Sequence, residues 1–400
     1  MHRVFSVLLS LFALVVVALA VPRAVDAEGN TLYVAYGGDE LDAGPGSSCS
    51  NPGYRSENQQ AIVNALGDAE AGDTVRICEG EYVYTDDGYG SSISDGVSIV
   101  GDGVSKTILD GNDAHYLMYL TDGAGITIRG ITFTNARDDY GSALTLRDTE
   151  ATVIDCAFLH NTATHAGEDY GGAGLYLYDE SNVKVISSRF EGNIAADDSA
   201  GGAINIYTND GVTASLVVQQ STFTGNEAGQ GPALYFYDND GLDASATDIV
   251  LVNNRFIGNV NTNLDDDNSD GGAIAFEHTD GNITMRGNTF INNEGANFGG
   301  AVEIWDVTGE IVVERNLFSG NVGDEGGAMW MDVRNGVQHV RKNTFRRNRS
   351  TGGGGAIAFE CESVSAVRII RSLEATNIFS GNRASQRRTV NVLASEYGCE

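Results

Sequence analysis

The sequence predicts an all-β fold, a right-handed parallel β-helix (a β-solenoid) of roughly ten to twelve coils. Three periodic features predict it: glycine-led strand starts, a phenylalanine in each repeat, and an asparagine three residues after most of these phenylalanines. The glycines are Gly141, Gly171, Gly201, Gly231, Gly271, Gly299, Gly326 and Gly354. The phenylalanines are Phe133, Phe158, Phe190, Phe223, Phe256, Phe290, Phe318, Phe345 and Phe379. The asparagines are Asn161, Asn193, Asn226, Asn259, Asn293, Asn321, Asn348 and Asn382.

One repeat unit, Gly299–Asn321, shows the local pattern. Val302 and Ile304 alternate with Glu303 and Trp305, which is the two-residue period of a strand with one buried face. Such a unit cannot bury its apolar face alone, so we expect it to stack on its copies. The residues seven and five positions before the phenylalanines should then point inward. These pairs are Ile126/Ile128, Val183/Val185, Leu216/Val218, Ile249/Leu251, Ile283/Met285 and Ile311/Val313.

Small or amide side chains stand two residues before the phenylalanines and should stack at one corner of the coils. They are Cys156, Ser188, Ser221, Asn254, Asn288, Asn316, Asn343 and Asn377. We expect an internal ladder that satisfies the backbone of the turns. Cys156 is therefore expected to be a ladder member rather than a reactive thiol.

Two sets of motifs resemble known families. The Gly-Gly-Ala-aliphatic starts, as in Gly201–Ile204 and Gly271–Ile274, together with Phe-x-x-Asn, resemble polymorphic membrane protein repeats. Gly72-Asp-Thr-Val and Gly96–Gly103 resemble right-handed parallel β-helices of the pectin-lyase type. The resemblance covers roughly residues 30–400 and implies the fold. It does not select a function, because the fold carries polysaccharide lyases, hydrolases, epimerases and adhesins.

The N-terminus has the pattern of an exported protein. His2-Arg3, the apolar run Val4–Val17 and the small residues Ala18-Leu19-Ala20 predict a signal peptide over residues 1–20, with an alternative cleavage after residue 27. We expect one domain over residues 28–400, made of a cap with the first coils (28–95), regular coils (96–388) and a C-terminal cap (389–400). No later stretch is apolar for long enough to span a bilayer, so we expect a secreted or cell-surface protein.

Both ends of a solenoid need covering, since open ends expose core and strand edges. Ser56-Glu-Asn-Gln59 has the form of a capping box, and we expect a short helix from Glu57 to Leu66 that ends at Gly67. Ala61, Ile62, Ala65 and Leu66 should share its buried face. Export permits disulfides, and proximity suggests pairing Cys49 with Cys78 and Cys361 with Cys399.

The net charge of the chain limits the classes of partner that it can bind. The formal charge of −31 argues against nucleic acid or an anionic membrane. Residues 334–388 oppose this trend, with eleven Lys or Arg against three acidic residues. Their densest cluster is Arg341, Lys342, Arg346, Arg347 and Arg349. This cluster is either a solvated face or the surface that receives an acidic partner, including the acidic coils of another copy in end-to-end self-association.

The strands after the glycine starts predict an outward face with two columns. Its aromatic members are Tyr176, Tyr178, Tyr207, Tyr235, Tyr237, Trp305 and Trp330. Because adjacent coils lie about 4.8 Å apart, the tyrosines should form a flat aromatic patch suited to stacking on sugar rings. The alternative is that loops fold over these aromatics and bury them.

Acidic residues extend the same face and are candidates for catalysis. Asp332 with Glu360, or Glu277 with Glu303, could lie near the ~5–5.5 Å carboxyl separation of retaining glycosidases. The alternatives are solvated carboxylates or a shared cation. A lyase is less well supported, because Arg147 is the one basic residue on this face.

A calcium site is conceivable in the acidic segment Asp265, Asp266, Asp267 and Asp270, which holds several oxygen ligands without the spacing of a dedicated loop. A solvated acidic loop is the alternative. The leading hypothesis is a secreted or surface binding protein, adhesin-like, that contacts glycan through its aromatic face. The alternatives are a polysaccharide-active enzyme, more readily a hydrolase than a lyase, and a structural solenoid that assembles end to end.

Overall fold

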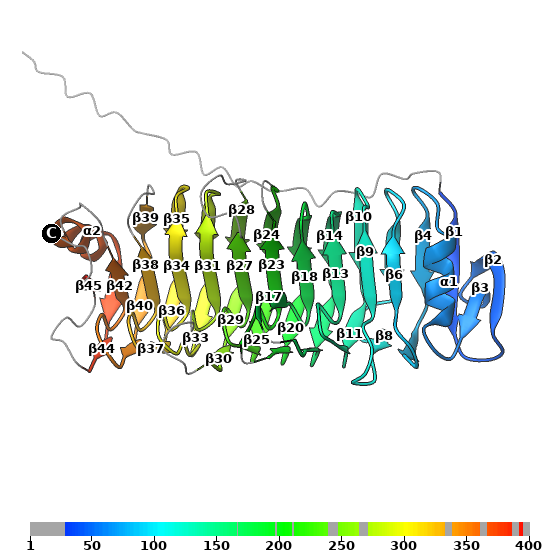
Figure 1. Cartoon of the computed structure of the whole chain (residues 1–400), viewed down its shortest axis with the longest axis horizontal. Helices are drawn as coiled ribbons and strands as arrows, with labels where there is room; N and C mark the ends of the chain where they lie inside the picture. The colour runs from blue at the N-terminus through cyan, green and yellow to red at the C-terminus, as the bar shows by residue number, and fades with distance from the viewer. Residues whose placement is uncertain are drawn as a thin grey trace, which may run out of the picture.

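The coils of the protein follow one another along a single long axis, from the blue N-terminal strands to the red helix near the C-terminus (Figure 1). The computed structural model describes residues 29–165, 167–196, 198–209, 212–238, 247–263, 271–332, 338–360, 366–385 and 392–394. These residues form a β-solenoid of parallel strands with two short helices, which confirms the predicted fold class. No helix in these ranges is both long and apolar enough to cross a membrane.

Three long sheets run along the axis. The first has thirteen strands, in the order β2 (Leu41–Ser48), β3 (Asn51–Ser56), β1 (Thr31–Tyr36), β4 (Thr74–Ile77), β7 (Ser98–Gly101), β10 (Ile126–Arg129), β14 (Glu150–Ile154), β19 (Asn182–Ile186), β24 (Ser215–Gln219), β28 (Asp248–Val252), β32 (Ile283–Arg286), β35 (Ile311–Glu314) and β39 (Gln338–Arg341). The second has eleven, in the order β5 (Gly80–Val83), β8 (Thr107–Asp110), β11 (Thr132–Thr134), β15 (Ala157–Leu159), β20 (Arg189–Glu191), β25 (Thr222–Thr224), β29 (Arg255–Ile257), β33 (Thr289–Ile291), β36 (Leu317–Ser319), β40 (Thr344–Arg346) and β43 (Ile378–Ser380).

The third sheet also has eleven strands, β6 (Tyr89–Ser92), β9 (Met118–Thr121), β13 (Leu144–Arg147), β18 (Leu175–Tyr178), β23 (Ile204–Thr208), β27 (Leu234–Asp238), β31 (Ile274–Thr279), β34 (Val302–Val307), β38 (Met329–Asp332), β42 (Ile357–Glu360) and β45 (Val392–Ala394). Shorter sheets join β12 (Arg137–Asp138), β16 (Thr162–Ala163), β21 (Ile194–Ala195), β26 (Glu227–Ala228) and β30 (Val260–Asn261); β17 (Gly167–Gly171) and β22 (Ser199–Ala200); and β37 (Val322–Gly323), β41 (Arg349–Ser350) and β44 (Arg383–Ala384).

The core holds the predicted inward residues and one continuous phenylalanine column. The six predicted inward pairs are at most 1% exposed. All nine phenylalanines stack on their neighbours, with ring centroids 4.6–5.1 Å apart and ring planes within 11° of parallel. Residues about thirty apart in the chain are therefore lateral neighbours, as the spacing predicts.

The asparagine of Phe-x-x-Asn builds a buried amide ladder beside this column. The backbone N–H and the Nδ2 of Asn193 both donate to Oδ1 of Asn226, at 3.0 and 2.9 Å. Nδ2 of Asn193 also donates to the carbonyl of Phe158 at 3.0 Å. The same bonds recur from Asn161 to Asn382. Each amide thus satisfies backbone groups that no water reaches and fixes the offset between coils.

The predicted second ladder is confirmed. Its asparagines repeat the pattern, as where the N–H of Asn288 donates to Oδ1 of Asn316 at 2.8 Å. At its N-terminal end the N–H of Cys156 donates to Oγ of Ser188 at 3.2 Å. Burial raises the pKa of the Cys156 thiol to about 12, so this cysteine is a structural ladder member.

Two turn positions in each coil from Phe133 to Phe345 have a left-handed backbone. They lie three residues before and two residues after the phenylalanine, as at Asn253 (φ 57°) and Asn292 (φ 52°). The steric cost of this conformation is absent for glycine and smallest, among other residues, for asparagine and aspartate. Seven of the 51 glycines occupy these corner positions: Gly130, Gly192, Gly225, Gly258, Gly287, Gly320 and Gly381.

The N-terminal cap differs in detail from the prediction. Helix α1 covers Gln60–Asp68 rather than Glu57–Leu66, and Gly67 lies inside it. The start is later because the Ser56 hydroxyl accepts a hydrogen bond from the N–H of Ala61 at 3.1 Å, instead of capping three residues on. The predicted buried face is confirmed.

A disulfide lies near the N-terminal end of the solenoid, and a helix covers its C-terminal end. The Cys49–Cys78 disulfide is confirmed, whereas Cys361 and Cys399 lie outside the described residues. Helix α2 (Ala366–Thr376), which the prediction missed, packs Ile369, Ile370 and Leu373 against the core at the C-terminal end (Figure 1).

We predict that Asn226→Ala destabilises the protein by about 2–4 kcal/mol, because it leaves buried amide and carbonyl groups without partners in two neighbouring coils. Denaturant unfolding followed by circular dichroism measures this. Asn253→Gly is the matched control: it alters an exposed corner asparagine whose left-handed backbone suits glycine, and should change stability by less than about 0.5 kcal/mol. Equal effects of both variants would contradict a structural role for the ladder.

Candidate functional site

The two outward columns of the third sheet form as predicted. Strand pairing places Tyr176 beside Thr145 and Asn205, and Tyr207 between Tyr178 and Tyr237. The same register continues through Glu277, Glu303, Trp305 and Trp330.

The aromatic members do not form the flat, open patch that the sequence analysis expects. The ring of Tyr207 stacks on Tyr178 (centroids 5.8 Å apart, planes 9° apart) and on Tyr237 (6.1 Å, 19°). Stacked rings cover one another's faces and turn their edges outward. The alternative, burial, holds for Tyr176, Tyr207, Tyr235 and Trp330, which are at most 7% exposed. Trp305 is 36% exposed and lies 5.1 Å from the His278 ring.

The four candidate catalytic acids lie on the same face and are not among the residues that line the pocket described below. Glu277, Glu303 and Asp332 are at most 3% exposed, and Glu360 is partly exposed. Asp332 is paired with Glu360 on neighbouring strands, whereas Glu277 is paired with Trp305, so that it lies diagonal to Glu303.

Hydrogen bonds help to explain the burial of Glu277 and Glu303. Oε2 of Glu277 accepts a hydrogen bond from the Tyr235 hydroxyl at 3.2 Å. Oε2 of Glu303 accepts one from the N–H of Gly271 at 3.0 Å. Both bonds connect the outward face to neighbouring residues of the fold.

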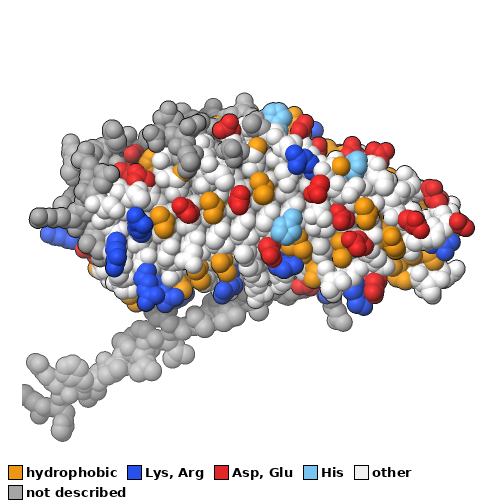
Figure 2. Space-filling view, turned by 90° about the horizontal axis from the view of Figure 1, so that it is seen from below, with side chains coloured by type: hydrophobic (Ala, Val, Ile, Leu, Met, Phe, Trp, Pro, Cys, Tyr) orange, Lys and Arg blue, Asp and Glu red, His pale blue; other side chains and the backbone are white. Residues whose placement is uncertain are grey.

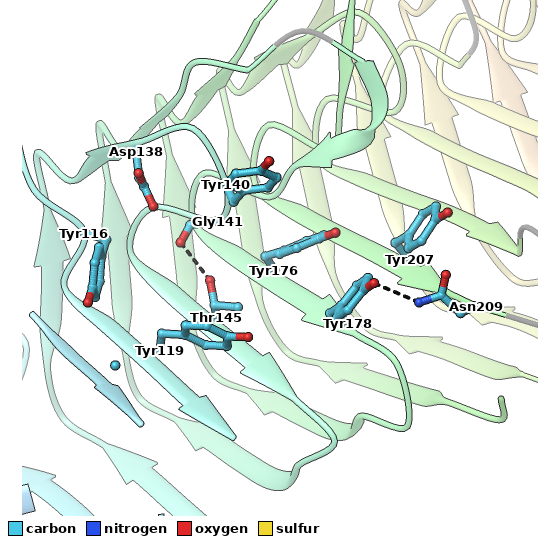
Figure 3. Close-up of a pocket in the computed structure, with 11 residues that line it drawn as sticks. Tyr116, Tyr119, Asp138, Tyr140, Gly141, Thr145, Tyr176, Tyr178, Tyr207 and Asn209 are labelled. Atoms are coloured by element: carbon cyan, nitrogen blue, oxygen red, sulfur yellow. Dashed lines mark hydrogen bonds between the residues drawn. The ribbon is translucent and has the colours of Figure 1, made fainter. Parts of the chain in front are cut away.

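A pocket of about 520 Å³ opens nearer the N-terminal end of this face (Figure 3). We call it the tyrosine pocket. Its walls come from the third sheet and from the connections that precede β9 and β13. Its lining residues are Gly90, Tyr116, Tyr119, Asp138, Tyr140, Gly141, Thr145, Tyr176, Tyr178, Tyr207 and Asn209. Three predicted ligand-binding residues, Tyr176, Tyr178 and Tyr207, therefore contribute to it.

Hydrogen bonds orient the polar groups of the pocket. Nδ2 of Asn209 donates to the Tyr178 hydroxyl at 2.8 Å and to Oδ1 of Asp179 at 2.6 Å. The Thr145 hydroxyl donates to the Gly141 carbonyl at 2.8 Å (Figure 3). Gly141 has φ 23°, and a Cβ there would lie 2.4 Å from atoms of Thr145 and Tyr176, so only glycine fits.

Arg147 fixes the far wall and is itself neutralised. Its Nε lies 3.1 Å from Asp179 and 3.4 Å from Asp148. Its guanidinium stands over the Tyr178 ring, 5.3 Å from the centroid. A hydrogen bond to Tyr119 and the charges of Asp179 and Asp148 raise the pKa of Arg147. Arg147, the basic side chain of the outward face, thus contacts two tyrosines of the pocket, Tyr119 and Tyr178.

Asp138 is the acidic side chain among the lining residues. Burial raises its pKa, and the charges of Asp87 and Asp139 raise it further, against hydrogen bonds from the backbone of Asp139 and Tyr140. Burial also raises the pKa of Tyr116, and Asp87 and Asp138 add to this. The carboxylates of Asp87 and Asp138 therefore make the Tyr116 edge of the pocket negative, and they oppose the ionisation of Tyr116.

Within the described ranges no three His, Cys, Asp or Glu side chains are grouped to hold a metal ion. The candidate calcium ligands Asp265, Asp266, Asp267 and Asp270 lie outside those ranges. The calcium hypothesis stays a prediction.

Sequence reasoning missed Tyr116, Tyr119, Asp138, Tyr140 and Asn209. Most of them lie in connections, where no repeat sets the register. The position of Tyr119 could have been predicted, because Tyr119 pairs with Thr145 and extends the first outward column by one strand.

The raised pKa of Asp138 predicts a pH dependence. Between the usual aspartate pKa, about 4, and the raised value, the folded protein binds more protons than the unfolded chain, so stability falls as pH rises. Asp138→Asn removes this loss, and its stability relative to the native protein should increase as pH rises through that window. Asp122→Asn is the control of opposite sign, because hydrogen bonds from Thr121 and Ser92 lower the Asp122 pKa. Parallel pH profiles for both variants would contradict the assignment.

Comparison with solved structures finds similar folds at low identity. An alginate lyase from Paenibacillus sp. str. FPU-7 is 14% identical over 86% of this chain and 97% of its own, with a TM-score of 0.45. A catalytic unit of an α-1,3-glucanase from Streptomyces thermodiastaticus is 13% identical over 85% of this chain and 65% of its own (TM-score 0.42). A polysaccharide lyase from Pseudopedobacter saltans is 12% identical over 82% of this chain and 91% of its own (TM-score 0.38).

Of the two comparisons at the level of sequence, one finds a match. No curated protein matches the chain. The polymorphic membrane protein repeats suggested by the motifs stay a prediction. Residues 89–240, which include all eleven lining residues of the tyrosine pocket, match the family model described as a right handed beta helix region.

Proposed function

We propose that the protein is carbohydrate-active and that the tyrosine pocket binds a glycan. The observation that carries the proposal is a cavity with six tyrosines and, between them, an amide, a hydroxyl and a carboxyl group. Sugar rings present apolar C–H faces and a rim of hydroxyls. Tyrosines provide both an apolar ring and a hydrogen-bonding hydroxyl, and the volume is within the usual range for ligand sites, about 300–1,000 Å³.

The electrostatics favour an uncharged or amino sugar over a uronate. Asp138 and the nearby Asp86 and Asp87 disfavour a further negative charge at the Tyr116 edge. Arg147, which could have attracted a carboxylate, is paired with Asp148 and Asp179. The pocket therefore suits neutral glycan better than the acidic substrate of a lyase.

We place this activity outside the cell, on the signal-peptide pattern of residues 1–20. The Cys49–Cys78 disulfide supports the assignment, because such bonds persist in oxidising compartments. If binding alone is the function, we propose that the protein is retained at a cell surface and acts as an adhesin-like protein.

We predict that Tyr140→Ala weakens glycan binding by about fivefold or more, since it removes an exposed ring at the pocket wall. A glycan array followed by titration calorimetry with the best neutral oligosaccharide measures this. Tyr36→Ala is a matched control: Tyr36 is 46% exposed and Tyr140 47%, and both have a ring contact, with Tyr82 and His165 respectively. Binding that both variants leave unchanged would remove the pocket from the proposal.

A second candidate function is hydrolysis of the bound glycan, favoured by the raised pKa of Asp138. A carboxyl group with a raised pKa keeps its proton at a higher pH than an ordinary aspartate does, and can protonate the oxygen of a leaving sugar. This hypothesis places the proton donor in the pocket rather than at Asp332/Glu360 or Glu277/Glu303.

For this candidate we predict that the native protein releases reducing sugar from the glycan it binds and that Asp138→Asn lowers the rate by about a hundredfold or more while binding persists. Asp39→Asn, which alters an exposed carboxylate near the N-terminal cap that does not act on Asp138, is the control. Binding without any release by the native protein would leave the glycan-binding proposal standing and exclude hydrolysis.

A further inference from the structure

Four arginines form an exposed row at one corner of the C-terminal coils, which we call the basic corner. They are Arg346 on β40, Arg347 beside it, Arg349 on β41 and Arg383 on β44. Arg349 and Arg383 are paired on neighbouring parallel strands, so their backbones are about one strand spacing, ~4.8 Å, apart. Figure 2 shows Lys and Arg side chains gathered toward this end of the molecule.

The charges of this corner are not balanced by the protein. Residues 334–388 carry a net charge of +8, so the rest of the chain carries −39. In the described part of the chain none of the four arginines has an ion pair, although Arg346 donates to the Ser319 hydroxyl at 3.1 Å. Like charges on neighbouring strands are unfavourable, and here they face one another without compensation.

The cations next to the basic corner, in contrast, are paired with a carboxylate. Arg315, Arg341 and Lys342 all lie within 4 Å of the Glu314 carboxylate. Burial acts to raise the pKa of Glu314, but the hydrogen bond from Lys342 and these charges outweigh it and lower the pKa. Glu314 thus neutralises one part of the basic cluster and leaves the basic corner open.

The fold does not require arginine at this place. Arg347 has φ 55° at the left-handed position two residues after Phe345. The equivalent positions of five other coils are glycines: Gly192, Gly225, Gly258, Gly320 and Gly381. A non-glycine residue in this conformation has a steric cost that glycine does not have. The sequence therefore carries a conformational cost that adds positive charge to a surface already positive.

We propose that the basic corner binds an anionic polysaccharide, one that bears sulfate or carboxylate groups, at a site separate from the tyrosine pocket. Guanidinium groups form paired hydrogen bonds with both kinds of anion, and a row of them along the coils matches a polymer with repeated charges. The acidic remainder of the surface repels such a polymer and confines it to this corner.

The surface fits a saccharide polymer better than a second copy of the chain. A stable protein interface needs an apolar centre. Between Lys342 and Arg383, Ile378 is the single large apolar side chain that is strongly exposed among the described residues.

The test measures binding of a heparin oligosaccharide and of oligogalacturonate, with dextran as the neutral control. We expect at least one of the two anionic probes to bind the native protein and to dissociate as NaCl is raised. The triple variant Arg346→Gln, Arg347→Gly, Arg349→Gln should lose about tenfold or more in affinity. Arg347→Gly alone should weaken binding without lowering the thermal midpoint, because glycine suits the backbone. Arg189→Gln with Arg255→Gln, exposed arginines of earlier coils, should have no effect.

Three outcomes would overturn the proposal. Neither anionic probe binds better than dextran, or the triple variant binds as tightly as the native protein. In the third, sedimentation shows self-association that the triple variant loses while no saccharide binds, which assigns the basic corner to a second copy. Each outcome is independent of the tyrosine pocket, whose residues are unchanged.

Discussion

The hydrogen bond between stacked asparagine amides is the interaction on which this structure depends. A β-helix has no water at its inner corners, so backbone groups that leave a strand there need partners from within the protein. One amide per coil supplies them: its oxygen accepts from the preceding coil, and its nitrogen donates to the following asparagine and to a buried carbonyl. These hydrogen bonds can all form only if consecutive coils keep the same offset along the chain. The ladder therefore stabilises the fold and sets its register together.

That register places the functional side chains. Tyr178 and Tyr207 are neighbours only because β18 and β23 pair in the offset the ladder imposes. Once stacked, these rings present edges rather than faces, and the cavity forms where the stack ends and the connections around Tyr116 and Tyr140 fold beside it. The same regularity at the other end aligns Arg349 with Arg383. Regular coils thus provide two surfaces of different chemistry, one aromatic and one cationic.

Much of the fold could be predicted because each coil repeats a few chemical requirements. Phe223 and Phe256 reveal the column since one ring per coil is needed to fill the core. The end elements were harder to predict. The hydroxyl of Ser56 accepts a hydrogen bond from a residue five positions later in the chain. Helix α2 takes the place of a strand after β39, and no repeat motif in the sequence indicates it. Tyr178 and Tyr207 were predicted site residues, but partners across the cavity such as Tyr116 and Tyr140 come from connections whose path no periodicity determines. The orientation of the rings depends on packing, which spacing alone does not specify.

Native-state hydrogen exchange of the ladder amides tests the central claim most directly. If the ladder sets the register, the backbone amides of Asn193, Asn226, Asn259 and Asn293 exchange only when the whole solenoid unfolds, with protection equal to that of the neighbouring core strands. Exchange of these amides at rates near those of an unprotected peptide, while the strands stay protected, would contradict the account.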